Sequence, residues 1–323
     1  MTPFVSLIIP FYNAADYIPH CLECVKNQDY ANFEVILIDD GSSDGSYNLC
    51  IHLTQDDTRF HVIHQDNSGP SAARNTGIDN AHGDAICFMD VDDEIESNYI
   101  SGLVHDAKEN SELVLQGMIR FSAGHTEDRG THIDKTYHLQ NIDEAKKLFS
   151  DINIERFGGP YCKLYYSGLL KKHNLHFNTS IRLAEDLDFL LQYLCVCTSV
   201  RVSSVCHYRY VANEGSVSSH LNSFETEYKG MCALIDTWNR FVEKYPFPSL
   251  SELRSHSIAY YVYRCLFSST STDDMQSIPQ EYIPIFEQHW RADTTYLMIV
   301  KWLFVHHCYR LSNALLLIAQ KSR

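Results

Sequence analysis

The chain has 323 residues, of which 45% are hydrophobic and 21% are charged, a balance typical of a globular protein with a substantial core. Its net charge of −15, from 26 basic and 41 acidic side chains, argues against general nucleic-acid binding. No apolar stretch approaches the roughly 20 residues needed to cross a bilayer, and the length permits two domains or one domain with additions.

The eleven cysteines follow no disulfide framework, and the opening segment MTPFVSLIIPFYNAADY lacks the basic start and the cleavage site of a signal peptide. We therefore expect free thiols and a reducing, cytoplasmic compartment. Cys21 and Cys24 have a CxxC spacing on an expected helix, but no second pair accompanies them. This favours two core cysteines over a metal site.

Strands and helices alternate through the first 120 residues. Near-continuous apolar runs predict four strands, at 5–12, 33–40, 60–66 and 84–93. Helical stretches are expected between them, at 14–27, after 43 and at 71–81. Apolar strands separated by helices indicate a parallel sheet that is covered on both faces.

Each expected strand ends in polar residues: Tyr12 and Asn13, Asp39 and Asp40, Asp66 and Asn67, and Asp90 to Asp93. Ligands of open α/β sheets bind at the carboxyl ends of the strands, so these side chains should line one pocket. Asp90 and Asp92 should point to the same side of a strand end, because strand side chains alternate. Paired carboxylates suit Mg²⁺ or Mn²⁺, although acidic turns are also common without a metal. Neither a GxGxxG turn nor a P-loop is present, which argues against those nucleotide-binding folds.

The chain becomes rich in expected strands and less regular between residues 111 and 137. Helical stretches follow at 143–150 and 185–197, and a strand at 200–210 precedes the loop VANEGSVSSH. After about residue 220 the pattern is helical to the end.

Six motifs follow one another in a specific order: SLIIPFYN (6–13), VILIDDGSSDGS (35–46), NSGPSAARNTGI (67–78), FMDVDD (88–93), KLY (163–165) and EDLDF (185–189). Over about residues 4–218 the chain thereby resembles the family 2 glycosyltransferases of bacterial surface-polysaccharide type, inverting enzymes with a glycosyltransferase A-type fold. The resemblance implies an α/β fold with a mostly parallel nucleotide-binding sheet between helices. A catalytic domain would cover 1–218, with a nucleotide-binding half at about 1–120 and an acceptor half at 121–218. A C-terminal helical region would cover 219–323.

The resemblance also implies a donor site that contains Pro10, Tyr12, Asn13, Asp39, Arg74 and Asp90. Tyr12 would lie against the nucleotide base, and Asp39 would accept a hydrogen bond from it, which favours uracil or guanine. Uridine diphosphate is the usual nucleotide of the family. Asp90 would hold the ribose hydroxyls or lie just outside the metal ligands, and Asp92 would bind Mn²⁺ or Mg²⁺. Arg74 would lie near the sugar and diphosphate, or else form a salt bridge within the acidic cluster.

Asp186 is the expected catalytic base. Inverting transfer requires a carboxylate that takes the proton of the acceptor hydroxyl as its oxygen attacks the anomeric carbon. A metal ion stabilises the charge that develops on the leaving diphosphate. The dipole of the helix that Asp186 begins lowers its pKa, so any rise must come from burial or from Glu185. Alternatively, both acids are ordinary residues of a helix N-terminus.

Three further donor-site residues are weaker candidates: Lys163, Arg209 and Ser218. The family often has a basic residue and a serine-rich loop after its last core strand, which YRYVANEGSVS matches loosely. His207 could be a third metal ligand, but the family pattern at this position is aromatic. A partly buried structural histidine is the alternative.

The segment 296–323 differs from the rest of the chain because it has no acidic residue. Lys301, Arg310, Lys321 and Arg323 give it a charge of +4, and it contains Trp302, Phe304 and many aliphatic residues. Such a basic helix can bind an anionic membrane surface. It can equally close the core of a C-terminal helical bundle.

We therefore expect a metal-dependent, inverting hexosyl or N-acetylhexosaminyl transferase. Its donor would be a nucleotide-diphosphate sugar and its acceptor a glycan or lipid-linked glycan of cell-surface polysaccharide. We expect it in the cytoplasm, in a peripheral position on the cytoplasmic face of the membrane if residues 296–323 bind lipid. A sugar nucleotidylyltransferase would need a basic, glycine-rich turn after the first strand, which PFYNAADY does not offer. A non-catalytic interaction subunit would be expected to lose Asp92 or Asp186, and both are present.

Overall fold

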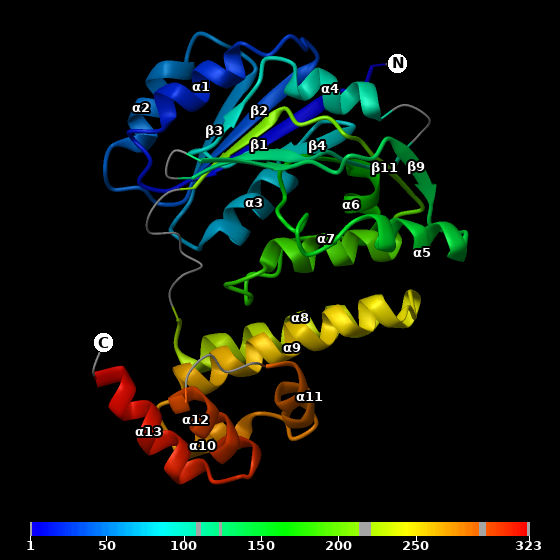
Figure 1. Cartoon of the computed structure of the whole chain (residues 1–323). Coiled ribbons are helices and arrows are strands. Elements are labelled where there is room, and N and C mark those ends of the chain that lie inside the picture. Colours follow the sequence, from blue (N-terminus) through cyan, green and yellow to red (C-terminus); the bar gives the residue numbers. More distant parts are fainter. Residues whose placement is uncertain (1, 108–110, 123–124, 213–220, 291–294, 322–323) are drawn as a thin grey trace. The chain divides into compact units, whose positions relative to one another are not determined.

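The computed structural model describes residues 2–107, 111–122, 125–212, 221–290 and 295–321. The chain divides into two compact units, residues 1–179 with 185–216, and residues 180–184 with 217–323. The described strands and helices α1–α7 belong to the first unit, and helices α8–α13 belong to the second (Figure 1).

The strands are β1 Val5–Phe11, β2 Phe33–Asp39, β3 Phe60–His64, β4 Ala85–Phe88, β5 Glu94–Ile95, β6 Leu113–Leu115, β7 Met118–Ser122, β8 His125–Arg129, β9 Lys135–His138, β10 Lys163–Tyr166, β11 Ser199–Val202 and β12 Tyr208–Val211. The helices of the first unit are α1 Ile18–Lys26, α2 Ser46–Thr54, α3 Pro70–Asp79, α4 Tyr99–Asp106, α5 Ile142–Asp151, α6 Ser167–His173 and α7 Glu185–Val196. Those of the second unit are α8 Phe224–Lys244, α9 Pro248–Ser268, α10 Thr272–Ser277, α11 Tyr282–His289, α12 Thr295–Val305 and α13 Tyr309–Lys321.

One mixed sheet forms the centre of the first unit, with its strands in the order β3-β2-β1-β4-β10-β6-β11-β9. β3, β2, β1 and β4 are parallel to one another. β10 is antiparallel to both of its neighbours, and β9 is antiparallel to β11. The predicted α/β fold, with a sheet that is largely parallel in the first 120 residues, is therefore confirmed.

Helices cover both faces of this sheet, with α1 and α4 on one face and α3 and α7 on the other (Figure 1). Val5, Leu7 and Ile9 of β1 pack in a single core with residues of α1 and α4. On the opposite face, Gly77 brings α3 so close to β1 that an added Cβ would lie 2.4 Å from Cγ2 of Ile8. Burial on both faces explains why β1 is almost continuously apolar.

An aromatic cluster holds α7 against the sheet. The ring of Phe189 on α7 stacks on Phe177 with 4.0 Å between centroids, and it meets Phe88 of β4 edge-on at 6.2 Å. Tyr165 of β10 packs against Phe189 and against Tyr193, at 5.4 and 5.0 Å. Such pairs contribute about 0.5–1.5 kcal/mol each beyond the area they bury. The cluster therefore fixes the position of the first turn of α7.

A second, smaller sheet has the strand order β5-β12-β7-β8. Its strand β5 follows directly after the acidic segment Asp90 to Asp93, and β12 pairs with it antiparallel, placing Arg209 opposite Glu94. The expected strand 84–93 was too long, because β4 ends at Phe88 and a turn occupies the next residues.

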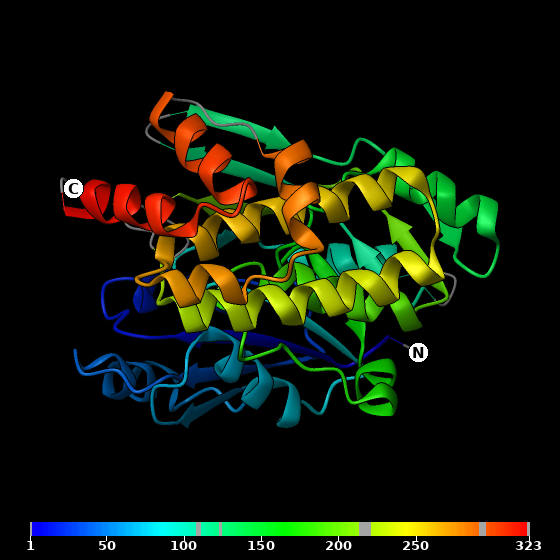
Figure 2. The same cartoon turned by 90° about the horizontal axis from the view of Figure 1, so that it is seen from below.

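The second unit is built around α8 and α9, which pack side by side (Figure 2). The helices bury the aromatic side chains Trp238 and Phe241 together with one ion pair. In this pair the guanidinium of Arg264 donates to both oxygens of Glu227, at 2.8 and 2.6 Å. Two hydrogen bonds with this geometry compensate for the removal of both charges from water.

The tail helices have one buried and one exposed side. On α12, Val300 and Phe304 are buried, whereas Met298, Ile299 and Trp302 are about half-exposed. Leu316 of α13 is buried and Leu311 is exposed. Within the described part of the chain, no helix combines the length and apolarity needed to span a membrane.

Candidate active site

The first loop of the site follows β1 and is tied to the loop after β2. Asn13 adopts a left-handed conformation with φ of 46°. Its side-chain oxygen accepts from the Ser43 backbone N–H at 2.8 Å, and its own N–H donates to Ser42 Oγ at 2.9 Å. Pro10 is buried within β1, and the ring of Tyr12 is 52% exposed. An exposed aromatic ring at a strand end is available to stack on a nucleotide base.

Two aspartates lie at the end of the second strand, and both already have protein partners. The buried Asp39 carboxylate accepts from His64 Nδ1 at 2.6 Å and from the Ser42 N–H at 3.2 Å. Asp40 accepts from the backbone N–H groups of Ser68 and Gly69, at 2.9 and 2.8 Å. The Asp40 contacts hold the loop before α3. His64 was not predicted from sequence, because a histidine at the end of a strand carries no specific signal.

The acidic segment after β4 is a turn and not a strand end. The Asp93 N–H donates to the Asp90 carbonyl at 3.1 Å, so the expected alternation of Asp90 and Asp92 along a strand is wrong. Asp93 is buried and accepts from Tyr208 Oη at 2.6 Å and from the Val211 N–H at 2.8 Å. Burial, reinforced by the neighbouring charge of Asp90, raises the pKa of Asp93 to about 8. Asp93 thus anchors the turn, while Asp90 and Asp92 remain partly exposed.

Asp90 and Asp92 meet the first requirement for a divalent-metal site. They supply hard carboxylate oxygens on one short turn, and neither is fully buried. Asp93 is a poor metal ligand, because its carboxylate already accepts hydrogen bonds from Tyr208 and from the Val211 N–H. The residues present consequently fit a Mg²⁺ or Mn²⁺ ion held by Asp92, with Asp90 adjacent.

Arg74 connects the acidic turn to the start of α7. It is buried on α3, where its Nη2 lies 3.0 Å from Asp90 Oδ1 and its Nη1 lies 3.1 Å from Asp186 Oδ1. The same Nη1 is 3.6 Å from Glu185 Oε1, and the guanidinium lies over the Phe177 ring at 5.4 Å. The salt bridge within the acidic cluster, which sequence reasoning kept as an alternative, is therefore present. It brings Asp90 and Asp186 together from segments 96 residues apart (186 − 90).

Asp186 lies in the first turn of α7 with a quarter of its side chain exposed. Burial, together with the charges of Glu185 and Asp90, raises the pKa of its carboxyl to about 7, even though Arg74 and Lys163 lower it. Burial and the neighbouring charge of Glu185, which the sequence suggested as possible causes of a raised pKa, are therefore both present in the structure. A carboxyl with a pKa near neutral can accept a proton during a reaction at physiological pH.

Two aromatic residues that were not predicted complete the surroundings of the turn. The rings of Tyr161 and Tyr208 stack with 4.8 Å between centroids and 15° between planes. Tyr208 carries the hydroxyl that donates to Asp93. Their role could not be read from the chain, because tyrosines are numerous and these two are 47 residues apart (208 − 161).

A family model described as glycosyl transferase family 2 matches residues 6–173, just over half of the chain. The chain belongs to this family. EpsH of Bacillus subtilis (strain 168) is 32% identical over 236 residues, covering 71% of this chain and 64% of that protein. The chain thus matches less than two thirds of the length of EpsH.

Two further comparisons extend this result. The GalNAc(5)-diNAcBac-PP-undecaprenol beta-1,3-glucosyltransferase of Campylobacter jejuni is 29% identical over 54% of this chain and 55% of its own. The crystal structure of S. aureus TarS 1–349 in complex with UDP-GlcNAc superposes with a TM-score of 0.66 at 18% identity, covering 99% of this chain and 92% of that one. The predictions of family and of fold are confirmed.

The remaining predicted donor residues of this family 2 chain lie in other environments. Lys163 is buried, and its ammonium donates to the carbonyls of Gly159 and Tyr161 at 2.5 and 3.3 Å. Burial lowers its pKa to about 8. Arg209 pairs with Glu96 at 3.0 Å, and His207 pairs with the same carboxylate at 3.1 Å. His207 thus has the surroundings of a partly buried structural histidine, and Ser218 lies outside the described residues.

The cysteines match the expectation of free thiols, since all eleven are unpaired by disulfides. Cys21 is buried, but Cys24 is only partly so, and its Sγ lies 3.8 Å from His20 Nε2. The expectation of two core cysteines therefore holds for Cys21 and was too simple for Cys24.

Proposed function

We propose that this chain is an inverting, metal-dependent glycosyltransferase that moves one hexosyl or N-acetylhexosaminyl unit from a nucleotide diphosphate to a hydroxyl of a growing glycan. One observation carries the proposal. Arg74 holds Asp90, on the donor side, and Asp186, the candidate base, at 3.0 and 3.1 Å from a single guanidinium. The proposed donor-binding acid and the proposed proton acceptor therefore meet at one guanidinium, although they come from distant segments of the chain.

The proposed reaction is one displacement at the anomeric carbon. The acceptor oxygen forms its bond to that carbon as the bond to the diphosphate oxygen breaks, and Asp186 takes the proton of the acceptor hydroxyl. The raised pKa of Asp186 suits this step, because the protonated product is then not strongly disfavoured. A divalent ion at Asp92 would supply Lewis-acid stabilisation of the leaving diphosphate.

We further propose that the donor is a uridine diphosphate sugar. Tyr12 offers a ring for the base, and Asp39 pairs with Phe11, the residue before Tyr12, where β1 and β2 end side by side. The UDP-GlcNAc bound by TarS is consistent with this choice. Because His64 already donates to Asp39, the base edge would meet this Asp39–His64 pair and not an isolated carboxylate.

The acceptor side of the proposal rests on the tail helices. Met298, Ile299, Trp302 and Leu311 are exposed on α12 and α13, in a segment without acidic residues. A surface of this composition favours an anionic membrane interface. The undecaprenol-linked acceptor in the name of the Campylobacter relative is consistent with a lipid-linked glycan. The proposal assigns catalysis to residues 1–218 and this contact to 296–323.

The decisive experiment is a donor screen that follows nucleotide diphosphate release from several UDP- and GDP-sugars, with Mn²⁺ or Mg²⁺ and a lipid-linked glycan acceptor. Release with one sugar nucleotide, together with a product of opposite anomeric configuration, would support the proposal. Retention of configuration would exclude the inverting mechanism. Release of a nucleoside triphosphate from a sugar nucleotide and pyrophosphate would instead indicate a nucleotidylyltransferase.

A further inference from the structure

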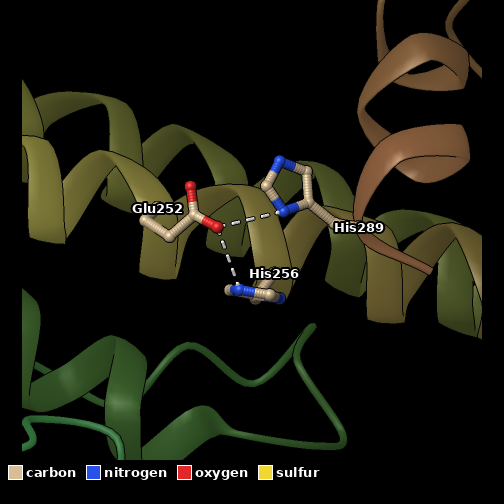
Figure 3. A group of neighbouring side chains, drawn as sticks. All are labelled: Glu252, His256 and His289. Carbon is tan, nitrogen blue, oxygen red and sulfur yellow. Dashed lines mark ion pairs between the residues drawn. The ribbon is translucent and has the colours of Figure 1, made fainter. Parts of the chain in front are cut away.

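A group of three potential metal ligands lies in the second unit, apart from the residues assigned to catalysis. Glu252 and His256 are on α9, and His289 ends α11. We call them the Glu252 cluster. Glu252 and His256 are four residues apart and so project from the same side of the helix. Figure 3 shows both imidazole rings directed at one oxygen of Glu252.

Two of the three ligand-to-ligand distances in the Glu252 cluster match a metal coordination shell, and the two histidine nitrogens lie within 4.8 Å of each other. His256 Nε2 lies 3.2 Å and His289 Nδ1 lies 3.4 Å from Glu252 Oε1. In a tetrahedral zinc site with bonds near 2.0–2.2 Å, ligand atoms are about 3.3–3.5 Å apart. The two imidazoles are nearly perpendicular, with 4.9 Å between centroids, so they do not block each other's access to a common ion.

The packing around His289 holds its backbone in place for this role. Trp290 follows α11 and stacks on Tyr263 of α9 with 4.2 Å between centroids, and Phe286 stacks on Trp290 at 6.1 Å. His289 itself is 9% exposed, whereas His256 and Glu252 are 52% and 59% exposed. One ligand is therefore fixed by the core, and the other two lie where an ion can enter from solvent.

Glu34 also has two histidines nearby, but its surroundings differ from those of the Glu252 cluster. Glu34 is approached by His61 at 3.6 Å and by His82 at 3.2 Å. However, Glu34 is buried and also accepts from Ser6 Oγ and from the His82 N–H, at 2.6 and 2.7 Å. Across the residues described by the structure, only the Glu252 cluster brings three such ligand atoms within 4.8 Å of one another.

We propose that Glu252, His256 and His289 bind a zinc-class divalent cation that joins α9 to α11. Two imidazoles and one carboxylate suit Zn²⁺ and Co²⁺, with the fourth position left for water. The hard carboxylates at Asp90 and Asp92 suit Mg²⁺ or Mn²⁺ instead, so the two sites should select different ions. Since the unfolded chain lacks the assembled site, binding of the cation should stabilise the folded second unit.

The test uses the full chain, stripped of metal and titrated with Co²⁺ in the presence of excess Mg²⁺. We expect one tightly bound equivalent with the visible absorption of tetrahedral Co²⁺ and without the near-ultraviolet band of a cobalt–sulfur bond. Saturating Zn²⁺, at about 100 times its Kd, should raise Tm by roughly 5 to 10 °C. Both effects are independent of glycosyl transfer.

His256→Ala and Glu252→Gln replace exposed side chains and should fold normally, yet each should lower Co²⁺ affinity by at least tenfold and remove the zinc-dependent rise in Tm. His289→Ala should do the same unless it fails to fold, in which case the two exposed variants decide. His82→Ala is the matched control and should retain the full Co²⁺ signal. Unchanged Co²⁺ binding in His256→Ala, or a dominant cobalt–sulfur band, would overturn the proposal.

Discussion

Asp186 is the residue on which the proposed chemistry depends most directly. Asp186→Asn keeps the size of the side chain and a contact to Arg74 but cannot accept a proton. General-base assistance is worth about 10² to 10⁴ in rate, so kcat should fall by that factor while donor affinity changes little. The measurement is steady-state transfer together with calorimetric binding of the nucleotide diphosphate.

Glu185→Gln is the matched control, because Glu185 also faces Arg74 but at 3.6 Å. It should cost much less than Asp186→Asn. Equal, mild losses for the two variants would mean that Asp186 is only a helix N-terminal acid. Loss of donor binding in Asp186→Asn would instead place it in the sugar or metal pocket.

The pKa of Asp186 predicts how transfer depends on pH. A base must be deprotonated to act, and burial raises this pKa to about 7. The kcat should therefore rise as pH increases through about 7 and fall about tenfold for each pH unit below it. A pH profile of kcat measures this limb directly. A flat profile between about pH 5.5 and about pH 8 would contradict the assignment.

Asp92 should control the metal dependence. Asp92→Asn removes a charged ligand, so nucleotide diphosphate binding should weaken when Mn²⁺ or Mg²⁺ is present and change little when it is absent. Calorimetry with and without chelator separates these two cases. Full transfer activity in excess chelator would remove the metal from the mechanism.

At the scale of elements, the acidic turn depends on its contact with β12. Tyr208→Phe deletes the hydroxyl that donates to buried Asp93 at 2.6 Å. A buried acceptor without its donor costs about 1–3 kcal/mol, so the free energy of unfolding should fall by that amount in urea titration. Tyr210→Phe, on the same strand but partly exposed, should change it by about 0.5 kcal/mol or less. Equal effects of the two substitutions would show that the Asp93 contact has no special importance.

The elements of the first 120 residues were predictable because their signal is local. Apolar runs such as residues 5–12 and 33–40 identify buried strands, and their polar ends identify the ligand edge. The end of β4 was placed five residues too late, since Val91 made FMDVDD read as a continuing strand. After the strand, the backbone N–H of Asp93 donates to the carbonyl of Asp90 and forms a turn, which no apolar pattern reveals.

The contacts of individual site residues were less predictable because they join distant segments. Lys163 belongs to the family motif KLY and was expected in the donor site. Its ammonium instead donates to the carbonyls of Gly159 and Tyr161. Arg209 matched a loose expectation of a donor-binding cation, but β12 sets it beside Glu96. Arg74 was the exception. Its salt bridge was foreseen as an alternative, because a cation between several acidic motifs has few other partners.

For the whole molecule, the exposed side of the tail helices predicts membrane association. Replacing Met298 and Trp302 together by serine should reduce sedimentation with anionic liposomes, because both side chains are about half-exposed and apolar. Ile142→Ser, which removes a side chain that is 52% exposed in the first unit, is the control and should have no effect. Sedimentation of the double variant at the level of the unmodified chain would exclude this surface as the membrane contact.

The three-way contact of Arg74 also has an evolutionary consequence. Its two terminal nitrogens serve Asp90 and Asp186 separately, and a lysine ammonium, although it keeps the charge, is a single point that cannot reproduce this fork. Arg74→Lys should therefore be selected against wherever both acids are retained. Positions 74, 90 and 186 should then vary jointly or not at all among related sequences, although helix, turn and helix start are far apart in the chain.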